Sequence, residues 1–519
     1  MKKKLLFALP LFGLALTSCS FINILSSSSA PAPSSSTEPA SSFVPVTYDS
    51  LYENYVKNAI YEQSAIPTSV KETKFLVIPV WFTDSSSLVN EEASVVKDRI
   101  QKAFFGTTEE TGWHSVKTYY EAESHGHKTI EGVVSDWYQE NRRLSYYAGS
   151  YDERDRTAEL VADAVNWFFE SNPSENRTDY DRDGDGYLDA LSVVYAAPNY
   201  SNHSYGSWEY RGERSTCTNF WAYVDWTAKA EYKNVNKPGP CAYLWASYDF
   251  ATQDISNCTV DAHAYIHETG HLFGLEDYYD YTNSALSPAG GFSMQDYNVG
   301  GHDPYSIIGL GWGSVNVPTE TGTFTLKPFE SSGEVILLSN NYSDSIFDEY
   351  LLLEYYTPTG VNAFDTAHQY SKKNPQGVST PGIRLWHVDS RLIYRNNGQW
   401  NETGITTEVT NEHEYRLLCT NNSPTNNESI DTSPLSGRGN YARYRLLNLL
   451  RRSDPSGRTS GANFASRDLF VAGDQFDMTK YARSFVERGR LNSGHELGWS
   501  FSVDAISEEG ATITVTKTA

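Results

Sequence analysis

The stretch 267-HETGHLFGLEDYYDY-281 carries two histidines four residues apart, with a glutamate directly after the first. If this stretch is helical, His267 and His271 project from one face, and their ring nitrogens can reach a single metal ion. Glu268 then lies where its carboxylate can take a proton from an attacking water. The spacing predicts a zinc site with a catalytic base. The alternative is a solvated helix face that carries two unrelated histidines.

A hydrolytic zinc site needs a third protein ligand and one open position. Thermolysin-like sites take a distant glutamate, but the segment 277–319 contains none. The shorter solution is a glycine that ends the helix, followed three residues later by a ligand, as in the metzincin pattern. Gly274 and Asp277 have this spacing, and a carboxylate is a legitimate zinc ligand. We therefore predict Asp277 as the third ligand. Three other side chains are rival ligands: Glu276, Asp280 and His302.

Metzincins also place a methionine turn beneath the metal. Met294 lies shortly after the zinc stretch, in 290-GGFSMQDYNVGGHDP-304, with glycines on both sides. A lone methionine is usually core filler, but its position here favours the Met turn. Tyr297 is the nearby candidate to stabilise the oxyanion of a tetrahedral intermediate.

A second metal site is predicted in 179-DYDRDGDGYLDA-190, where aspartates alternate around two glycines. Such a loop brings several hard oxygens to one centre, as calcium requires. It is not a full EF-hand, because the twelfth residue counted from the first ligand is a serine. Without a cation the carboxylates would repel one another, which disfavours a merely acidic solvated loop. The predicted calcium ligands are Asp181, Asp183, Asp185, the carbonyl of Tyr187, and Asp189.

The N-terminus predicts export. Three lysines precede an apolar run that is too short to span a bilayer, which indicates a signal peptide over 1–18. Small residues before Cys19 resemble a bacterial lipobox, so we expect a lipid on Cys19 and a Ser/Pro/Ala tether over 19–45. This predicts a protein anchored at the bacterial cell surface, with membrane contact only through that lipid. The alternative is an ordinary secreted protein.

Composition excludes some functions and leaves others open. The 519 residues suffice for two or three domains, and the net charge of −24 argues against binding nucleic acid or an anionic membrane. The four cysteines after Cys19 allow three pairings, of which Cys217 with Cys241 is preferred. Free thiols are the alternative. The oligomeric state is open.

The pattern of elements predicts an α+β fold. Apolar runs indicate buried strands at 74–82 and 190–198, and helices are expected at 91–105 and 259–273. The segment 199–250 is predicted to form long loops. From about residue 320, short strands separated by turn residues predict an all-β, sandwich-like region. We expect a catalytic domain over 46–318 and a β-rich C-terminal domain over 319–519.

The chain resembles the immune inhibitor A type of secreted bacterial metallopeptidases from about residue 70 onward. Besides the zinc stretch, the blocks FLVIPVWFTDSS, YYEAESHGH, DYDRDGDGYLDALSVVYAAP, GGFSMQDYN, GLGW, EYLLLEYYTPTGVNAFD and GIRLWHVD occur in the family's order. The resemblance implies a metzincin-like zincin domain with His267, His271 and Asp277 as ligands. It also implies Glu268 as base and Met294 as the turn. One departure is the glutamine after the methionine, where relatives more often have a small residue or aspartate.

The expected function is zinc-dependent endopeptidase cleavage of extracellular proteins or peptides. Glu268 would take a proton from water and pass it to the leaving amine. The expected cleft lies between residues 46–275 and a lower half built on the Met turn. The alternative is a surface adhesin or glycan-binding lipoprotein that uses a peptidase-like scaffold. A serine hydrolase is disfavoured, because the chain has no G-x-S-x-G motif.

Overall fold

The computed structural model describes the following residues: 43–46, 66–148, 155–202, 208–210, 213–215, 219–227, 230–281, 287–371, 374–396, 399–410, 413–422, 444–456 and 463–518. The predicted signal peptide, Cys19, most of the predicted tether and Cys217 lie outside these ranges, so the lipid anchor and the cysteine pairing stay predictions. Within the ranges, no helix has both the length and the apolar character needed to cross a membrane.

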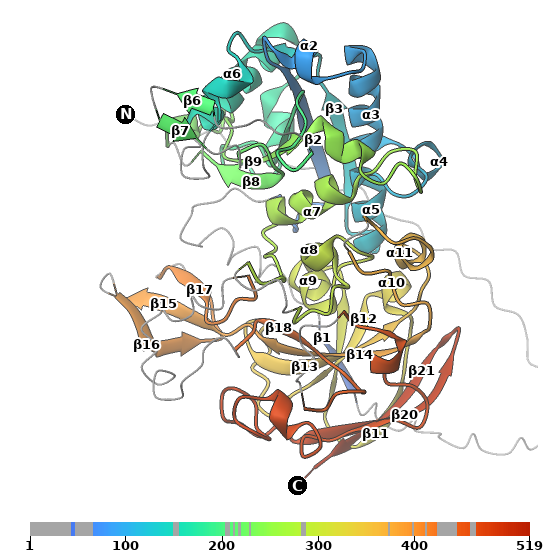
Figure 1. The fold of residues 1–519 in the computed structure, drawn as a ribbon. Coiled ribbons are helices and arrows are strands. Elements are labelled where there is room, and N and C mark those ends of the chain that lie inside the picture. The colour runs from blue at the N-terminus through green and yellow to red at the C-terminus, as the bar shows by residue number, and fades with distance from the viewer. Residues whose placement is uncertain are drawn as a thin grey trace, which may run out of the picture. The chain divides into compact units, whose positions relative to one another are not determined.

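A mixed sheet forms the framework of the first half of the chain (Figure 1). Its strand order is β3-β2-β5-β9-β8, in which only β8 runs antiparallel to its neighbour, and the short β4 extends the edge beside β2. The strands are β2 (Glu72–Trp81), β3 (Thr129–Val134), β4 (Tyr138–Gln139), β5 (Ala190–Tyr195), β8 (Tyr223–Trp226) and β9 (Ala242–Ser247).

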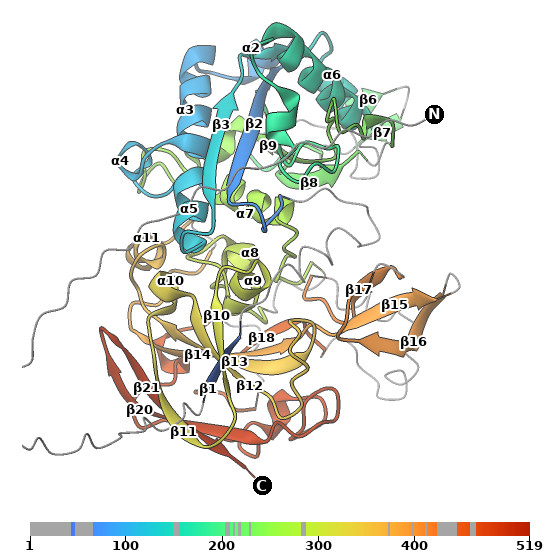
Figure 2. The same cartoon turned by 180° about the vertical axis from the view of Figure 1, so that it is seen from behind.

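Helices cover both faces of this sheet, which explains the continuous apolar runs of its central strands. Along β2, Phe75 and Val77 join the core that also contains α3 (Ala93–Phe105) and α5 (Val116–Glu123). The alternate residues Leu76 and Ile78 join the core formed with α6 (Asp155–Ser171) (Figure 2). The two-residue period of a strand thus distributes the side chains of β2 between two cores.

Two further large sheets consist mainly of strands from the second half of the chain. One has the order β1-β10-β12-β13-β14-β18 and the other β11-β21-β20-β19. Every pairing within them is antiparallel except β10 with β12. The first comprises β1 (Phe43–Val46), β10 (Ser314–Pro318), β12 (Glu334–Leu338), β13 (Glu349–Tyr356), β14 (Gly382–Asp389) and β18 (Leu447–Leu450). The second comprises β11 (Gly322–Leu326), β19 (Gln475–Phe476), β20 (Trp499–Ser507) and β21 (Gly510–Lys517).

Both faces of the six-stranded sheet are also buried. Leu351 and Leu353 of β13 share a core with Phe501 and Val515 of the four-stranded sheet, a sandwich-like arrangement. On the opposite face, Leu352 belongs to the large core that contains the helices of the first half. The β-rich region therefore shares a core with Tyr265 and Ile266, which precede the predicted ligand His267.

The remaining elements are short. The helices are α2 (Ser85–Leu88), α4 (Thr108–Thr111), α7 (His263–Leu272), α8 (Met294–Tyr297), α9 (Pro304–Gly309), α10 (Phe329–Ser332) and α11 (Asn362–Ala367). The strands β15 (Leu392–Asn396), β16 (Gln399–Thr406) and β17 (Tyr415–Leu417) form a three-stranded sheet, and β6 (Trp208–Tyr210) pairs with β7 (Glu213–Ser215).

The structure confirms the predicted strands at 74–82 and 190–198, the two predicted helices and the β-rich second half. The prediction of long loops over 199–250 was wrong for part of that segment, because β8 and β9 lie in it. All six residues of β9 are buried. A short strand buried on both faces has no alternating pattern. Pro238 and Pro240 just before it are residues typical of loops, so the start of the strand was not recognised.

Candidate metal centre

Helix α7 carries the two histidines and is fixed on two sides. The hydroxyl of Tyr265 donates to the carbonyl of Ser247 at the end of β9 over 2.7 Å. The hydroxyl of Tyr120 in α5 donates to the carbonyl of Ile266, also over 2.7 Å. The central sheet and α5 therefore each bind α7 through one of these hydrogen bonds.

A glycine turn follows α7, as the sequence predicted. Gly274 has a φ of +88°, a region that glycine adopts without a steric penalty. The amide of Gly274 donates to the backbone carbonyl of His271, and the amide of Leu275 donates to the carbonyl of Gly270. These bonds end the helix. Nδ1 of His271 lies 2.7 Å from the carbonyl of Leu275, to which it donates in the corresponding tautomer. The turn thus reverses the chain and also orients one of the histidine rings.

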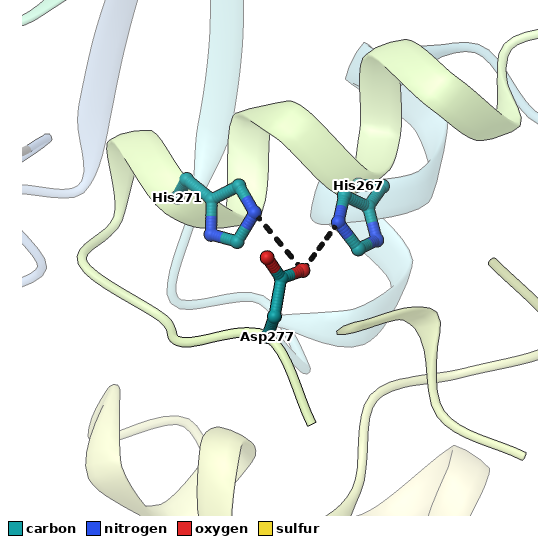
Figure 3. A group of neighbouring side chains, drawn as sticks. All are labelled: His267, His271 and Asp277. Carbon is teal, nitrogen blue, oxygen red and sulfur yellow. Dashed lines mark hydrogen bonds and ion pairs between the residues drawn. The ribbon is translucent and has the colours of Figure 1, made fainter. Parts of the chain in front are cut away.

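The structure brings the three predicted zinc ligands together. Nε2 of His267 lies 2.9 Å from Oδ1 of Asp277, and Nε2 of His271 lies 3.3 Å from the same oxygen. Figure 3 shows the two rings pointing from α7 toward this carboxylate, which comes from the segment after the turn. The ligand-type atoms of the three residues all lie within 4.8 Å of one another.

The geometry suits a tetrahedral metal ion. Neighbouring ligand atoms around zinc lie about 3.3 Å apart when the metal–nitrogen distance is about 2.0–2.1 Å. The two separations measured from Asp277 are close to this value. Nδ1 of His267 lies 2.7 Å from the carbonyl of Met294, so a proton held on Nδ1 leaves Nε2 as the metal-binding atom. Met294 is fully buried and begins α8, in the position predicted for the Met turn.

The electrostatics of the cluster favour a cation among these groups. Burial by itself would raise the pKa of Asp277, but the facing His271 and His267 hold it below its usual value. Burial would lower the pKa of His271, but Asp277 raises it to about 10. A metal ion bound between the ring and the carboxylate would take the place of a proton.

The rival ligands lie outside this group. The carboxylate of Asp280 accepts from Arg445 at 3.3 Å. The carboxylate of Glu276 accepts from Asn422 at 3.2 Å. The ring nitrogens of His302 have no hydrogen-bond partner among the described residues, and burial, together with charge on the metal-site histidines, lowers its pKa to about 3. His302 is thus close enough to influence the cluster without joining it.

The structure says less about the predicted catalytic side chains, Glu268 and Tyr297, than about the predicted ligands. Glu268 is buried next to His267, and its charge helps to raise the pKa of His271. Tyr297 is half-buried in α8, and its ring centroid lies 6.3 Å from that of Tyr279. Neither contact tests a catalytic role, so both roles stay predictions.

Two tyrosines near the cluster were missed by the sequence analysis. The hydroxyl of Tyr281 donates to Oδ2 of Asp277, the oxygen that does not face the histidines. The ring of Tyr279 lies 6.4 Å from that of His267 between centroids, and burial raises its pKa well above the usual value. The available signal was their spacing, two and four residues after Asp277 in a chain that turns sharply.

The second predicted metal loop is partly assembled as expected. Ligand-type oxygens of Asp181, Asp183 and Asp189 lie within 4.8 Å of one another. The carboxylate of Asp185 instead accepts the amide of Tyr187 at 2.8 Å, and no contact tests the predicted role of the Tyr187 carbonyl. The structure thus groups three of the four predicted carboxylates.

One buried carboxylate oxygen of this loop, Oδ1 of Asp189, is suited to binding a cation. Asp189 is 1% exposed, and its Oδ1 has no hydrogen-bond partner in the described part of the chain. Burial and the neighbouring carboxylates raise its pKa to about 8, although the amide of Arg182 donates to its other oxygen. An unpaired buried carboxylate oxygen is costly unless a proton or a metal neutralises it. Gly184 and Gly186, with φ of +73° and +94°, permit the tight loop.

Comparison with known proteins agrees with this geometry. Residues 62–295 match the family model described as the catalytic domain of immune inhibitor A peptidase M6. The resemblance to the immune inhibitor A peptidases is confirmed. The range that matches the immune inhibitor A model contains the metal-site residues of α7, Asp277 and Met294, and it ends before Tyr297.

Two similar proteins are the pre-pro-metalloproteases PrtV of two strains of Vibrio cholerae serotype O1. Each is 26% identical to this chain over 233 residues, which covers 38% of the chain and 23% of the relative. The chain thus spans less than a quarter of the length of the curated relatives that it matches. The similarity supports a metalloprotease of the immune inhibitor A type.

Proposed function

We propose that this protein is a zinc-dependent endopeptidase that hydrolyses extracellular proteins or peptides. The observation that carries the proposal is the convergence of His267, His271 and Asp277, on one helix and its C-terminal turn, at separations that suit a tetrahedral ion. The match to an immune inhibitor A catalytic domain over the same residues supports it. The metzincin-like fold and the division into a catalytic domain over 46–318 and a β-rich domain over 319–519 belong to the same proposal.

The proposed chemistry assigns one task to each group. Zinc, when bound, supplies Lewis acidity toward water and the scissile carbonyl. Glu268 takes the proton of the attacking water and delivers it to the leaving amine. Its buried position keeps the carboxylate poorly solvated and close to the histidine ligands. Tyr297 is assigned to the oxyanion of the intermediate, and Tyr281 orients the Asp277 carboxylate through its hydroxyl.

The proposed location is the bacterial cell surface, with the chain exported by residues 1–18 and held by a lipid on Cys19. The support is the sequence alone, in which lysines, a short apolar run and small residues precede this cysteine. Secretion without a lipid is the alternative outcome. Mass spectrometry of the mature N-terminus distinguishes the two.

Metal content and cleavage together test the proposed function. We expect about one zinc per purified wild-type chain and cleavage of casein that phenanthroline inhibits. The variant His271→Ala should lose both the zinc and the cleavage, because two ligands do not hold the ion tightly. A folded wild type without zinc would contradict the mechanism and favour the adhesin or glycan-binding alternative. Zinc without cleavage of casein would redirect the search to narrower substrates.

We also propose a structural calcium ion in the loop 181–189, ligated by Asp181, Asp183 and Asp189, with Asp185 and the Tyr187 carbonyl completing the shell. The observation that favours it is Oδ1 of Asp189, which has no hydrogen-bond partner among the described residues. The ion would fix the loop that leads into β5, the second core strand of the sheet. The proposed role is stability, since the loop contributes no residue to the zinc group.

Calcium is expected to stabilise the wild-type protein, because it binds only the folded loop. At a calcium concentration of 100 times Kd the gain is about 2.7 kcal/mol, which raises Tm by several degrees. Thermal unfolding of zinc-loaded protein with calcium or EGTA measures this shift. Asp189→Ala should abolish the shift, whereas the nearby Asp179→Ala should keep it. A wild-type Tm that does not change when calcium is added would refute the second metal site.

A further inference from the structure

His263, the first residue of α7, lies one helical turn before His267 and belongs to neither metal group. Its ring is fully buried between two aromatic rings in nearly parallel planes. The centroid of Trp113 lies 4.0 Å away on one side and that of Tyr370 3.9 Å away on the other. The two flanking rings prevent the imidazole of His263 from rotating, so both of its nitrogens point in fixed directions.

Both nitrogens point at carboxylates. Nδ1 lies 2.8 Å from Oδ1 of Asp261, and Nε2 lies 3.2 Å from Oδ1 of Asp365. With both carboxylates ionised, each ring nitrogen donates, and the ring is an imidazolium. The aromatic faces of Trp113 and Tyr370 also favour a cation between them. Burial by itself would lower the pKa of His263, but Asp365 and Asp261 raise it to about 10.

The contacts of this imidazolium continue to the Met turn. Asp365 belongs to α11, which follows β13 of the six-stranded sheet, and its Oδ2 accepts from the amide of Gly300 at 2.6 Å. The adjacent Gly301 accepts from the amide of Met294 at 3.1 Å. The carbonyl of Met294 lies 2.7 Å from Nδ1 of His267. The contacts therefore form a closed network, which starts at His263 of α7 and returns to α7 at His267, the first metal-site histidine.

We propose that His263 is a positioning residue, which fixes the start of α7 to Asp365 of α11 and, through Gly300, sets the alignment of the zinc ligands against the Met turn. This inference rests on the proposed function, because it assigns the network a role at the zinc site. In this proposal the β-rich region takes part in catalysis, and only hydrogen bonds connect it to the metal site.

Two neutral variants test the proposal, His263→Gln and Asp365→Asn, with their double variant. Zinc affinity is measured by chelator competition at a temperature where each protein is folded, and kcat and KM are measured separately. Each single change should weaken zinc binding and lower kcat by about tenfold, the lower end of the effect known for partners that orient metal ligands. KM should stay within twofold. The double variant should be no worse than either single one, because the two side chains act as one unit.

A matched control separates positioning from stability. His387 of β14 is also a buried histidine on a carboxylate, with Nε2 2.8 Å from Oε1 of Glu349. His387→Gln should lower Tm as His263→Gln does, yet leave zinc affinity and kcat within twofold of wild type. If His263→Gln fails to fold, Asp365→Asn carries the test, because an asparagine oxygen still accepts from Gly300.

The outcomes distinguish this inference from the proposed function. If the wild type binds zinc and cleaves while both His263→Gln and Asp365→Asn keep full zinc affinity and kcat, only the positioning role is overturned. If the wild type binds no zinc, the proposed function fails and the positioning role fails with it. Weaker zinc binding in both variants, but not in His387→Gln, supports the proposal.

Discussion

Glu268→Gln is expected to remove nearly all cleavage while the protein keeps its zinc. Glutamine has the size and shape of glutamate but cannot accept a proton from water at neutral pH. General acid–base groups contribute about 10²–10⁴-fold to a rate, so kcat should fall within that range. KM should change little, because the substitution removes an interaction made in the transition state. Steady-state kinetics on a fluorogenic peptide, with zinc content by mass spectrometry, measures both quantities.

Glu276→Gln is the control for this prediction. Glu276 is a second carboxylate near the site, and it accepts from Asn422 on another segment. Burial raises its pKa, so a neutral replacement at this position costs little. The Glu276→Gln protein should retain most of the wild-type kcat. Equal losses in Glu268→Gln and Glu276→Gln would show that the site tolerates no change at all and would remove the argument for Glu268 as the base.

Asp277→Ala is expected to release the zinc. The carboxylate supplies one of three ligands, and its charge offsets the positive charge of the ion. The zinc affinity should fall by more than the roughly 10–100-fold that follows the loss of a partner outside the ligand set. Equilibrium dialysis against a chelator measures the loss, and cleavage should disappear with the metal.

Asp280→Ala tests the assignment of the third ligand. Asp280 lies three residues further along and was a rival ligand in the sequence analysis, but its carboxylate accepts from Arg445. The Asp280→Ala protein should keep its zinc, although it leaves Arg445 without that partner and is expected to be less stable. Retention of zinc in Asp277→Ala, together with its loss in Asp280→Ala, would reverse the assignment.

The grouping of His267, His271 and Asp277 was predictable because it is local. The two histidines are four positions apart, so helix geometry alone aligns them. Gly274 permits the turn that returns Asp277 to the same place three residues later. The grouping of Asp181, Asp183 and Asp189 has the same origin, since alternating aspartates and two glycines in one loop need no distant segment. Such contacts depend on a few backbone angles that the residue types themselves restrict.

Other features depended on the path of the chain. The sequence did not reveal β9, because a short strand buried on both faces looks like any apolar loop segment. It did not reveal that Tyr281 donates to Asp277, because the direction of its side chain depends on the fold after the turn. The partner of His263 lies 102 residues away in α11, beyond the reach of any local pattern.

By itself, the sequence determined the helix, the turn, the three grouped zinc-type ligands, the calcium-type loop and the β-rich second half, since spacing and residue type restrict the backbone over a few residues. Only the tertiary structure decided how these parts meet. It buried one face of the six-stranded sheet in the same core as α7, and it placed Asp365 between His263 and Gly300. The reason is that burial of apolar surface has no direction or partner preference of its own, so long-range neighbours are settled by the packing of the whole chain.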